Sequence, residues 1–195
     1  MTTRCPFGDP ERANDQFAGG KRQGDKQQGN GNLETAREVS SIPRLNDGQE
    51  DSRWIYPSER MFFDAMKRKD WDPKEADMKS IIPIHNAVNE RAWHEIVKWE
   101  QGYGSDRCGG PKLVTFQGDA SKLTPKARML SLVGYQKPFD RHDWTIDRCG
   151  QKIEYVIDFY HGRSKNPTDI SLYLDVRPKI SWEGLRMRFG KLFTD

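Results

Sequence analysis

Residues 153–159 read Ile-Glu-Tyr-Val-Ile-Asp-Phe, so a large apolar side chain stands at every second position. A period of two residues is typical of a β-strand with one buried face. The same period recurs at 170–176, Ile-Ser-Leu-Tyr-Leu-Asp-Val, beyond a polar loop around 162–168. We therefore expect two strands joined by this loop, and a further short strand at 113–116.

Helical patterns occupy much of the preceding chain. Ser58 is placed to cap a first helix, and an apolar stripe at helical spacing follows over 61–66. Asp72-Pro73 signals the start of a second helix, which Pro83 is expected to break or kink. A third helical pattern then runs over 85–101.

Two later helices are expected after the capping residues Thr124 and Ser181, and 138–144 reads as an irregular polar and aromatic segment. The predicted class is α+β, in which several helices outweigh a small antiparallel sheet.

The first 40 residues differ in composition from the rest. All six Trp and all six Tyr come after residue 50, and 19–32 consists almost entirely of Gly, Gln, Asn, Asp and Lys. Such a segment buries too little apolar surface to offset the entropy lost on ordering. We expect 1–40 to be a disordered, flexible arm with one Cys-Pro pair, and 41–195 to form one domain.

Charge and hydropathy argue against a nucleic-acid partner and against a membrane-spanning segment. The net charge is only +3 and no run of five basic residues occurs, so nucleic acid is not an expected partner. No stretch approaches ~20 apolar residues, which predicts a soluble or peripheral protein. The last helix has an apolar and a basic side over 182–193, so it could lie on a membrane or dock on its own domain.

The three cysteines are Cys5, Cys108 and Cys149. An odd number at wide spacing argues against a disulfide framework, and the lack of a Cys-x-x-Cys pair argues against a zinc ribbon or thioredoxin-like chemistry. Cys5-Pro6 has the form of a haem-regulatory pair, in which a thiolate binds ferric iron, but a dipeptide in a flexible arm also arises by chance.

Isolated histidines lie among aromatic residues, without the spacing of a zinc site and without a nucleophile motif or phosphate loop. This pattern is compatible with haem, which one imidazole can hold by the iron. His85 opens the third helix and shares one side of it with Asn89 and Trp93. The plainer interpretation of His85 is a partly buried histidine in a helix cap.

A second candidate is the run Asp140-Arg141-His142-Asp143-Trp144. Carboxylates on either side of an imidazole fix its orientation, and Arg141 could clamp a carboxylate such as a haem propionate. The plainer interpretation is an ion-paired surface turn. Trp54, Trp93 and Trp144 are equally consistent with ordinary core packing.

Taken in order, several segments resemble the holocytochrome c synthase (cytochrome c haem lyase) family over about residues 38–193. The most specific is Pro138-Phe139-Asp140-Arg141-His142-Asp143-Trp144. The others include Ser40-Ser41-Ile42-Pro43, Trp54-Ile55-Tyr56-Pro57-Ser58, Ile84-His85-Asn86, Thr124-Pro125-Lys126-Ala127-Arg128, Arg148-Cys149-Gly150 and Leu174-Asp175-Val176-Arg177-Pro178.

The resemblance implies a lyase that binds haem b and joins its two vinyl groups to the cysteines of a Cys-x-x-Cys-His motif in apocytochrome c. It implies a location in the mitochondrial intermembrane space, peripherally associated with the inner membrane. A histidine at the place of His85 is an axial iron ligand in the family. Residues matching Trp54, Glu90, His142 and Arg148 are tied to haem handling or activity.

The predicted site therefore has His85, Glu90 and His142 as catalytic residues, inside several helices that surround a haem cavity. Haem contacts are expected from His85 and His142 and also from Trp54, Asn89, Trp93, Arg141, Trp144 and Arg148, and Cys5 is a weaker candidate iron ligand. The client's own motif histidine would take the other axial position. The alternatives are a non-catalytic haem carrier or sensor, an interaction scaffold, and a lyase that prefers cytochrome c1.

Overall fold

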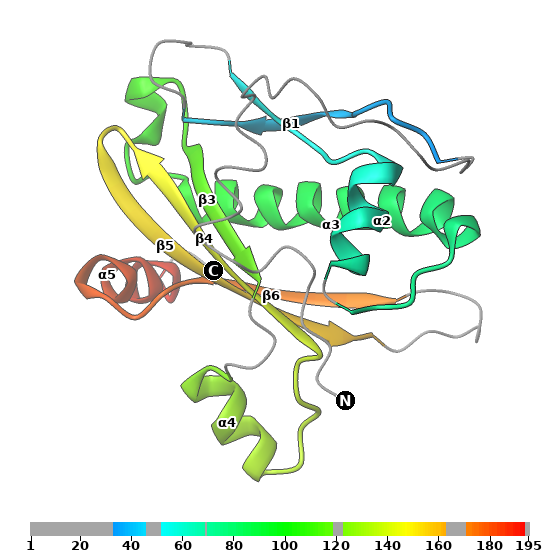
Figure 1. Cartoon of the computed structure of the whole chain (residues 1–195). Helices are drawn as coiled ribbons and strands as arrows, with labels where there is room; N and C mark the ends of the chain where they lie inside the picture. Colours follow the sequence, from blue (N-terminus) through cyan, green and yellow to red (C-terminus); the bar gives the residue numbers. More distant parts are fainter. Residues whose placement is uncertain (1–32, 46–51, 69, 119–122, 163–170, 194–195) are drawn as a thin grey trace.

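The computed structural model describes residues 33–45, 52–68, 70–118, 123–162 and 171–193 (Figure 1). Helices and antiparallel strands are mixed along the chain, which confirms the predicted α+β class. Cys5 and most of the predicted arm fall on residues 1–32, outside the described residues. The described fold begins ahead of residue 41, because Leu33 and Ser40 are buried in it.

A four-stranded antiparallel sheet lies at the centre of the fold, in the order β3-β4-β5-β6. Its strands are β3 (Lys112–Gly118), β4 (Asp140–Arg148), β5 (Gln151–His161) and β6 (Leu172–Pro178). The alternating run at 153–159 lies in β5, where Ile157 pairs with Val176 of β6. The short strand expected at 113–116 lies within β3.

Strand β4 corrects the expectation that 138–144 is irregular. It pairs with β5 along its whole length. Its buried side chains alternate with more exposed ones and are His142, Trp144, Ile146 and Arg148. Two of these four are polar, so a search for apolar residues at every second position does not find the strand.

A second, two-stranded sheet covers one edge of the first. It consists of β1 (Val39–Pro43) and β2 (Arg53–Ile55). Just after β1, Arg44 forms a bridge with Leu113, and the backbone amide of Leu45 donates to the Leu113 carbonyl at 2.9 Å. These contacts occupy backbone groups of β3, which would otherwise be an open edge strand there.

Helix α2 (Glu59–Lys67) begins as predicted, because the Ser58 side chain accepts a hydrogen bond from the Met61 amide. Helix α3 (Glu75–Glu100) corrects the expectation of two separate helices, because it continues through Pro83. The proline removes one backbone hydrogen bond, but packing holds the helix on both sides of it. Met78 and Ile82 pack against α2, and further along Ala92 and Ile96 pack against the large sheet.

The last two helices begin at the predicted caps. In α4 (Pro125–Leu132) the Thr124 side chain accepts from the Ala127 amide, and in α5 (Trp182–Lys191) the Ser181 side chain accepts from the Gly184 amide. In Figure 1, α4 projects from the sheet on the side away from α3. The buried residue of α4 is Ala127, so most of this helix is in contact with solvent.

The residues predicted as the apolar side of α5 mostly face solvent. Trp182 is 92% exposed and Phe193, just beyond the helix, is 88% exposed. The helix docks instead through Gly184 and Met187, which are buried. Among the described residues, no helix combines the length and apolar character needed to cross a membrane.

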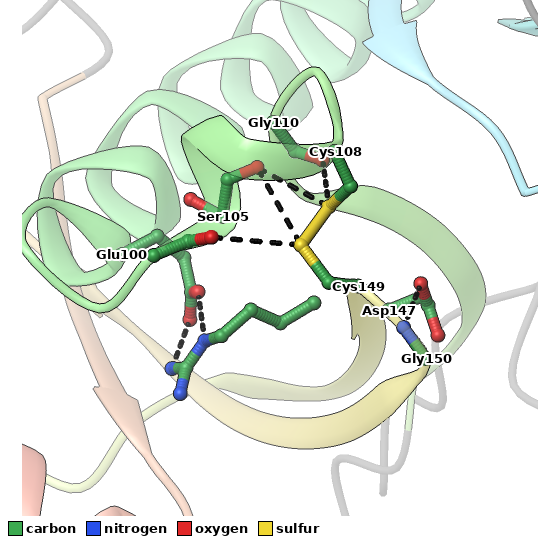
Figure 2. The surroundings of a disulfide bond; sticks show 9 residues. Glu100, Ser105, Cys108, Gly110, Asp147, Cys149 and Gly150 are labelled. Atoms are coloured by element: carbon green, nitrogen blue, oxygen red, sulfur yellow. Dashed lines mark hydrogen bonds and ion pairs between the residues drawn. A yellow bond between two sulfur atoms is a disulfide. The ribbon is translucent and has the colours of Figure 1, made fainter.

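A disulfide bond between Cys108 and Cys149 overturns the expectation drawn from the cysteine spacing (Figure 2). Cys108 ends the 3-10 helix η1 (Ser105–Cys108), and Cys149 lies in the tight turn between β4 and β5. The two residues are 41 positions apart in sequence, but Lys112 of β3 pairs with Asp147 of β4, which brings these chain segments together. A long-range pairing of this kind is not visible in cysteine spacing alone.

Candidate active site

A mainly apolar cavity of about 250 Å³ lies between α3 and the strands β4, β5 and β6. It brings together three residues that sequence analysis selected, namely His85, Asn89 and His142. The other lining residues come from the same elements and from the segment before β4, and they are Ile81, Ile84, Val88, Phe139, Asp140, Phe159 and Leu172. The cavity is thus bounded by one helix and the sheet, where several helices around it were expected.

His85 is half-buried on the cavity wall. Its Nδ1 lies 3.3 Å from Nδ2 of Asn89, one helical turn further on, and its ring meets the edge of Phe62 from α2 at 5.4 Å between centroids. The Asn89 amide presents either its NH₂ group or, after a half-turn, its carbonyl oxygen to this nitrogen. With the carbonyl oxygen accepting the Nδ1 proton, the lone pair of His85 is on Nε2, the arrangement that a metal-binding histidine needs.

His142 is only 4% exposed and reaches the same cavity from β4. Its Nε2 lies 3.2 Å from a carboxylate oxygen of Asp140, and its ring packs edge-on against Phe159 at 4.8 Å. A carboxylate at this distance helps to fix the orientation of the imidazole. The cavity therefore carries two imidazoles of different character, one beside an amide and one beside a carboxylate.

Arg141 does not line the cavity. It alternates with His142 along β4, so its side chain leaves the opposite face of the sheet. Its guanidinium donates to both carboxylate oxygens of Asp143, at 2.8 and 3.1 Å.

The tryptophans predicted as haem contacts lie in the core beside the cavity. Trp144 is 1% exposed and packs against Phe116 at 5.9 Å between ring centroids. Phe116 in turn meets Trp54 at 4.9 Å. Trp93 is buried in the same core cluster. These rings support the wall of the cavity and are not part of its lining.

Glu90 lies next to Asn89 in sequence but points away from the cavity lining. Its carboxylate accepts hydrogen bonds from the hydroxyls of Ser40, at 2.5 Å, of Ser41, and of Tyr56, at 3.0 Å. Burial alone would raise the pKa of Glu90, but these donors outweigh it and lower the pKa below its usual value. Glu90 therefore ties β1 and the segment before α2 to the helix that carries His85.

Arg148 lies at the opposite end of β4 from His142, about 20 Å away for six residues of strand. It donates to the carboxylates of Glu100, at 2.6 and 2.9 Å, and of Glu183, at 2.6 Å. Burial alone would lower the pKa of Arg148, but the two carboxylates outweigh it and raise the pKa. The hydroxyl of Tyr155 also donates to Glu100, at 2.5 Å. This cluster joins the end of α3 to β4 and α5.

Sequence reasoning missed several residues of the cavity. Phe139 and Asp140 stood in the most specific segment of the family resemblance, so a signal for them existed. Ile84 and Phe159 also stood in segments of that resemblance, whereas Leu172 read only as a strand residue and Ile81 only as a helix residue near Pro83. Nothing in the local sequence separates an apolar side chain that lines a cavity from one that fills a core.

Comparison with known proteins supplies the family. The model of the cytochrome c/c1 heme lyase family matches residues 16–191. A Schizosaccharomyces pombe protein named as a proposed holocytochrome-c1 synthase is 62% identical over 159 residues, which cover 80% of this chain and 73% of the relative. The holocytochrome c-type synthase of Bos taurus is 48% identical over 169 residues, which cover 82% of this chain and 60% of the relative. No solved structure matches the chain.

A second Schizosaccharomyces pombe protein, named as a proposed holocytochrome-c synthase, is 37% identical over 168 residues, which cover 80% of this chain and 43% of the relative. The chain thus spans less than two thirds of the bovine protein and of this second yeast protein. The match over residues 16–191 shows that the chain belongs to the cytochrome c/c1 haem lyase family, whose members are lyases.

Proposed function

We propose that this protein binds haem b at the cavity between α3 and the sheet and attaches it by thioether bonds to the Cys-x-x-Cys-His motif of an apocytochrome. The observation that carries the proposal is that His85 and His142, 57 positions apart in number, line one apolar cavity. Family membership supports it independently.

The size of the cavity indicates how haem would sit. At about 250 Å³ it is smaller than the ~300–1,000 Å³ of sites that enclose drug-sized ligands. The rim residues Ile81, Ile84 and Phe139 are each more than a third exposed. We infer that the porphyrin enters by one edge and that the client segment covers the remainder.

In this arrangement His85 holds the iron from one side, and the motif histidine of the client holds it from the other. The two client cysteines then lie beside the vinyl groups, so the main catalytic effect is proximity and orientation. In each addition the thiol loses its proton, its sulfur bonds to one vinyl carbon as the carbon–carbon π bond opens, and the other vinyl carbon takes up a proton, so no net proton is consumed. We assign the transfer of this proton to His142, because its ring lines the cavity beside Asp140.

The client that we propose is apocytochrome c1, in preference to apocytochrome c. The two Schizosaccharomyces pombe relatives allow a comparison within one organism, and the chain is 62% identical to the c1 relative but 37% identical to the c relative. A competition between the two apocytochromes, offered at equal concentration, tests this. Equal or greater haem attachment to apocytochrome c would contradict the preference.

The test of the main proposal is co-expression of the chain with each apocytochrome. We expect haem that resists acid and organic extraction and a mass increase of one haem on the client. His85→Ala should abolish both, together with the Soret band of the purified lyase. Haem that binds but is always extracted would support a non-catalytic carrier or sensor, and normal loading of His85→Ala would contradict the ligand assignment.

We further propose a mitochondrial location, in the intermembrane space and on the surface of a membrane. A disulfide favours a compartment more oxidising than the cytosol. The exposed apolar residues of α5, among them Trp182, Phe189 and Leu192, suit the interface of a bilayer. Replacing Trp182 and Phe189 by Ser should release the protein from vesicles that contain anionic lipid, whereas Tyr173→Ser on β6 should not. Equal sedimentation of both variants with vesicles would argue against this surface.

A further inference from the structure

The Cys108–Cys149 disulfide is open to reagents in solution. Both cysteines are exposed. Figure 2 shows the sulfur–sulfur bond at the meeting of η1 and the β4–β5 turn, with Ser105 and Gly110 beside it. The bond borders an open cavity of about 790 Å³, which Arg107 and Arg186 also line. Exposed disulfides are the ones that small thiols reduce, in contrast to buried structural bonds.

The chain segment that carries Cys108 has little conformational preference of its own. It runs over 102–110 and contains four glycines, all with positive φ between 79° and 99°. Glycine adopts many backbone conformations with similar free energy, so such a segment keeps one shape only where other contacts fix it. At its C-terminal end the disulfide provides that contact.

The other fixed point of this segment is Tyr103, which packs on α5. Its hydroxyl donates to the Met187 carbonyl at 3.3 Å, and its ring lies 5.2 Å from each guanidinium carbon of Arg148 and Arg186. At Gly190 of α5 an added Cβ would come within 2.6 Å of the Tyr103 hydroxyl, so the helix approaches this tyrosine closely. The position of the 102–110 segment and the docking of α5 are therefore linked.

In the reduced form, each cysteine thiol would have a carbonyl oxygen nearby as a hydrogen-bond acceptor. The sulfur of Cys108 lies 3.3 Å from the Ser105 carbonyl oxygen, and the sulfur of Cys149 lies 3.5 Å from that of Gly104. After reduction each thiol can donate to its neighbouring carbonyl. Cys149 and Gly150 form the two-residue turn between the paired residues Arg148 and Gln151, with φ of 49° and 89°, so the hairpin keeps Cys149 in place when the disulfide opens.

We propose that Cys108–Cys149 is a site of exchange with small thiols of the glutathione class, and that its redox state sets how firmly the 102–110 segment and α5 are held. A thiolate attacks one sulfur, which breaks the protein disulfide and leaves a mixed disulfide and one cysteine thiolate that takes up a proton. A second small thiol then attacks the mixed disulfide. The sum is one protein disulfide and two small thiols giving two protein thiols and one small disulfide.

The experiment uses the full chain with Cys5→Ser, so that only this pair reacts. The protein is equilibrated over a series of ratios of reduced to oxidised glutathione, quenched with iodoacetamide and weighed by mass spectrometry. We expect a change from no label to two labels within this series, while circular dichroism shows that the protein stays folded.

Trypsin should cut the reduced form at Arg186, Arg188 or Lys191 about tenfold faster, because cleavage follows the population of the open state.

The matched control adds Cys108→Ser and Cys149→Ser to the same background, and this variant should be cut at the fast rate in every buffer. Three outcomes would overturn the proposal. The first is a disulfide that is reduced only when the protein unfolds, and the second is cysteines that never pair in oxidised glutathione. The third is an equal cleavage rate of α5 in the reduced and oxidised forms. None of them depends on haem or on the client, so all are separate from a failure of the proposed lyase activity.

Discussion

Asn89 and Glu90 are neighbours on α3, but their side chains make different contacts. Asn89 contacts the His85 ring and lines the cavity, whereas Glu90 holds β1 and Tyr56 against the helix. The sequence allowed both to be selected, but it did not separate a residue that lines the cavity from one that positions the helix. The difference arises because Glu90 meets donors from a segment about 50 residues earlier, and such long-range contacts leave no local pattern.

Asn89→Ala removes the partner that orients His85. We expect haem affinity to fall about 10- to 100-fold, the usual effect of losing the hydrogen-bond partner of a metal-binding histidine. Titration of the apoprotein with haem, followed by the Soret band, measures the change. Asn89→Asp keeps an acceptor oxygen and should retain most of the affinity. If both variants bind haem as tightly as the original chain, Asn89 does not orient the ring.

Because the pKa of Glu90 is lowered in the folded protein, we expect the free energy of unfolding to depend on pH. Its pKa in the folded protein is lowered, while in the unfolded chain it is close to ~4.3. The unfolded state therefore binds the proton first as pH falls. The stabilisation is complete above about pH 4.3 and is lost as pH drops through the folded-state pKa.

Glu90→Gln should accordingly lower the free energy of unfolding by about 1 kcal/mol at neutral pH, a modest value because the site is partly exposed. The difference from the original chain should shrink below about pH 4. Urea unfolding at a series of pH values measures it. A difference that stays constant down to pH 3 would show that the charge of Glu90 is not responsible.

At the scale of elements, the sequence predicted three helix starts and the strands with apolar alternation, because caps and periodicity are local. Ser58, Thr124 and Ser181 all cap as expected. The start expected at Asp72-Pro73 was wrong, because α3 begins at Glu75 after Lys74 and no side chain caps it. The predictions failed where tertiary packing, and not the local sequence, determines the secondary structure. Helix α3 continues through Pro83 because cores on both sides hold it, and β4 forms although its buried residues are half polar.

Pro83→Ala tests the claim that packing overrides a local break. The substitution restores one helix hydrogen bond and removes the ~3 kcal/mol by which proline destabilises a helix interior. Proline also stiffens the unfolded chain, and losing that effect offsets part of the gain. We therefore expect the free energy of unfolding to rise by about 1–2 kcal/mol. Pro125→Ala is the matched control, because Pro125 begins α4 where no hydrogen bond is missing, and it should not stabilise. Thermal unfolding of both variants decides. A destabilised Pro83→Ala would mean that the proline itself is needed for packing at this point of α3.

In the whole molecule, α3 and β4 are joined by a buried ion pair at one place and border the apolar cavity at another. Glu100 and Arg148 meet in a buried ion pair at one end, and His85 and His142 face the apolar cavity at the other. The sequence selected all three of His85, His142 and Arg148, but it could not show that Arg148 is remote from the cavity. The distance follows from the extended strand β4, which the sequence analysis had expected to be irregular over 138–144.

Arg148→Met tests whether Arg148 stabilises the fold without taking part in the cavity. Removing one partner of a buried ion pair should cost about 3–5 kcal/mol, because the carboxylates of Glu100 and Glu183 lose their counter-charge. Chemical unfolding measures the loss, and Lys179→Met, which breaks the exposed pair with Glu154, should cost less than about 1 kcal/mol. At low temperature the folded fraction of Arg148→Met should still bind haem through His85. Loss of haem binding by fully folded Arg148→Met would place Arg148 in direct contact with haem.

The bond between Cys108 and Cys149 turns part of the chain into a closed ring that contains β3, α4 and β4, and with them His142. A pore that passes a polypeptide as a single extended strand excludes such a ring. The chain must therefore cross any such pore with its thiols unjoined and close the ring on the far side. Oxidation of the pair would then keep the folded chain from passing back through such a pore, and reduction would remove that restriction.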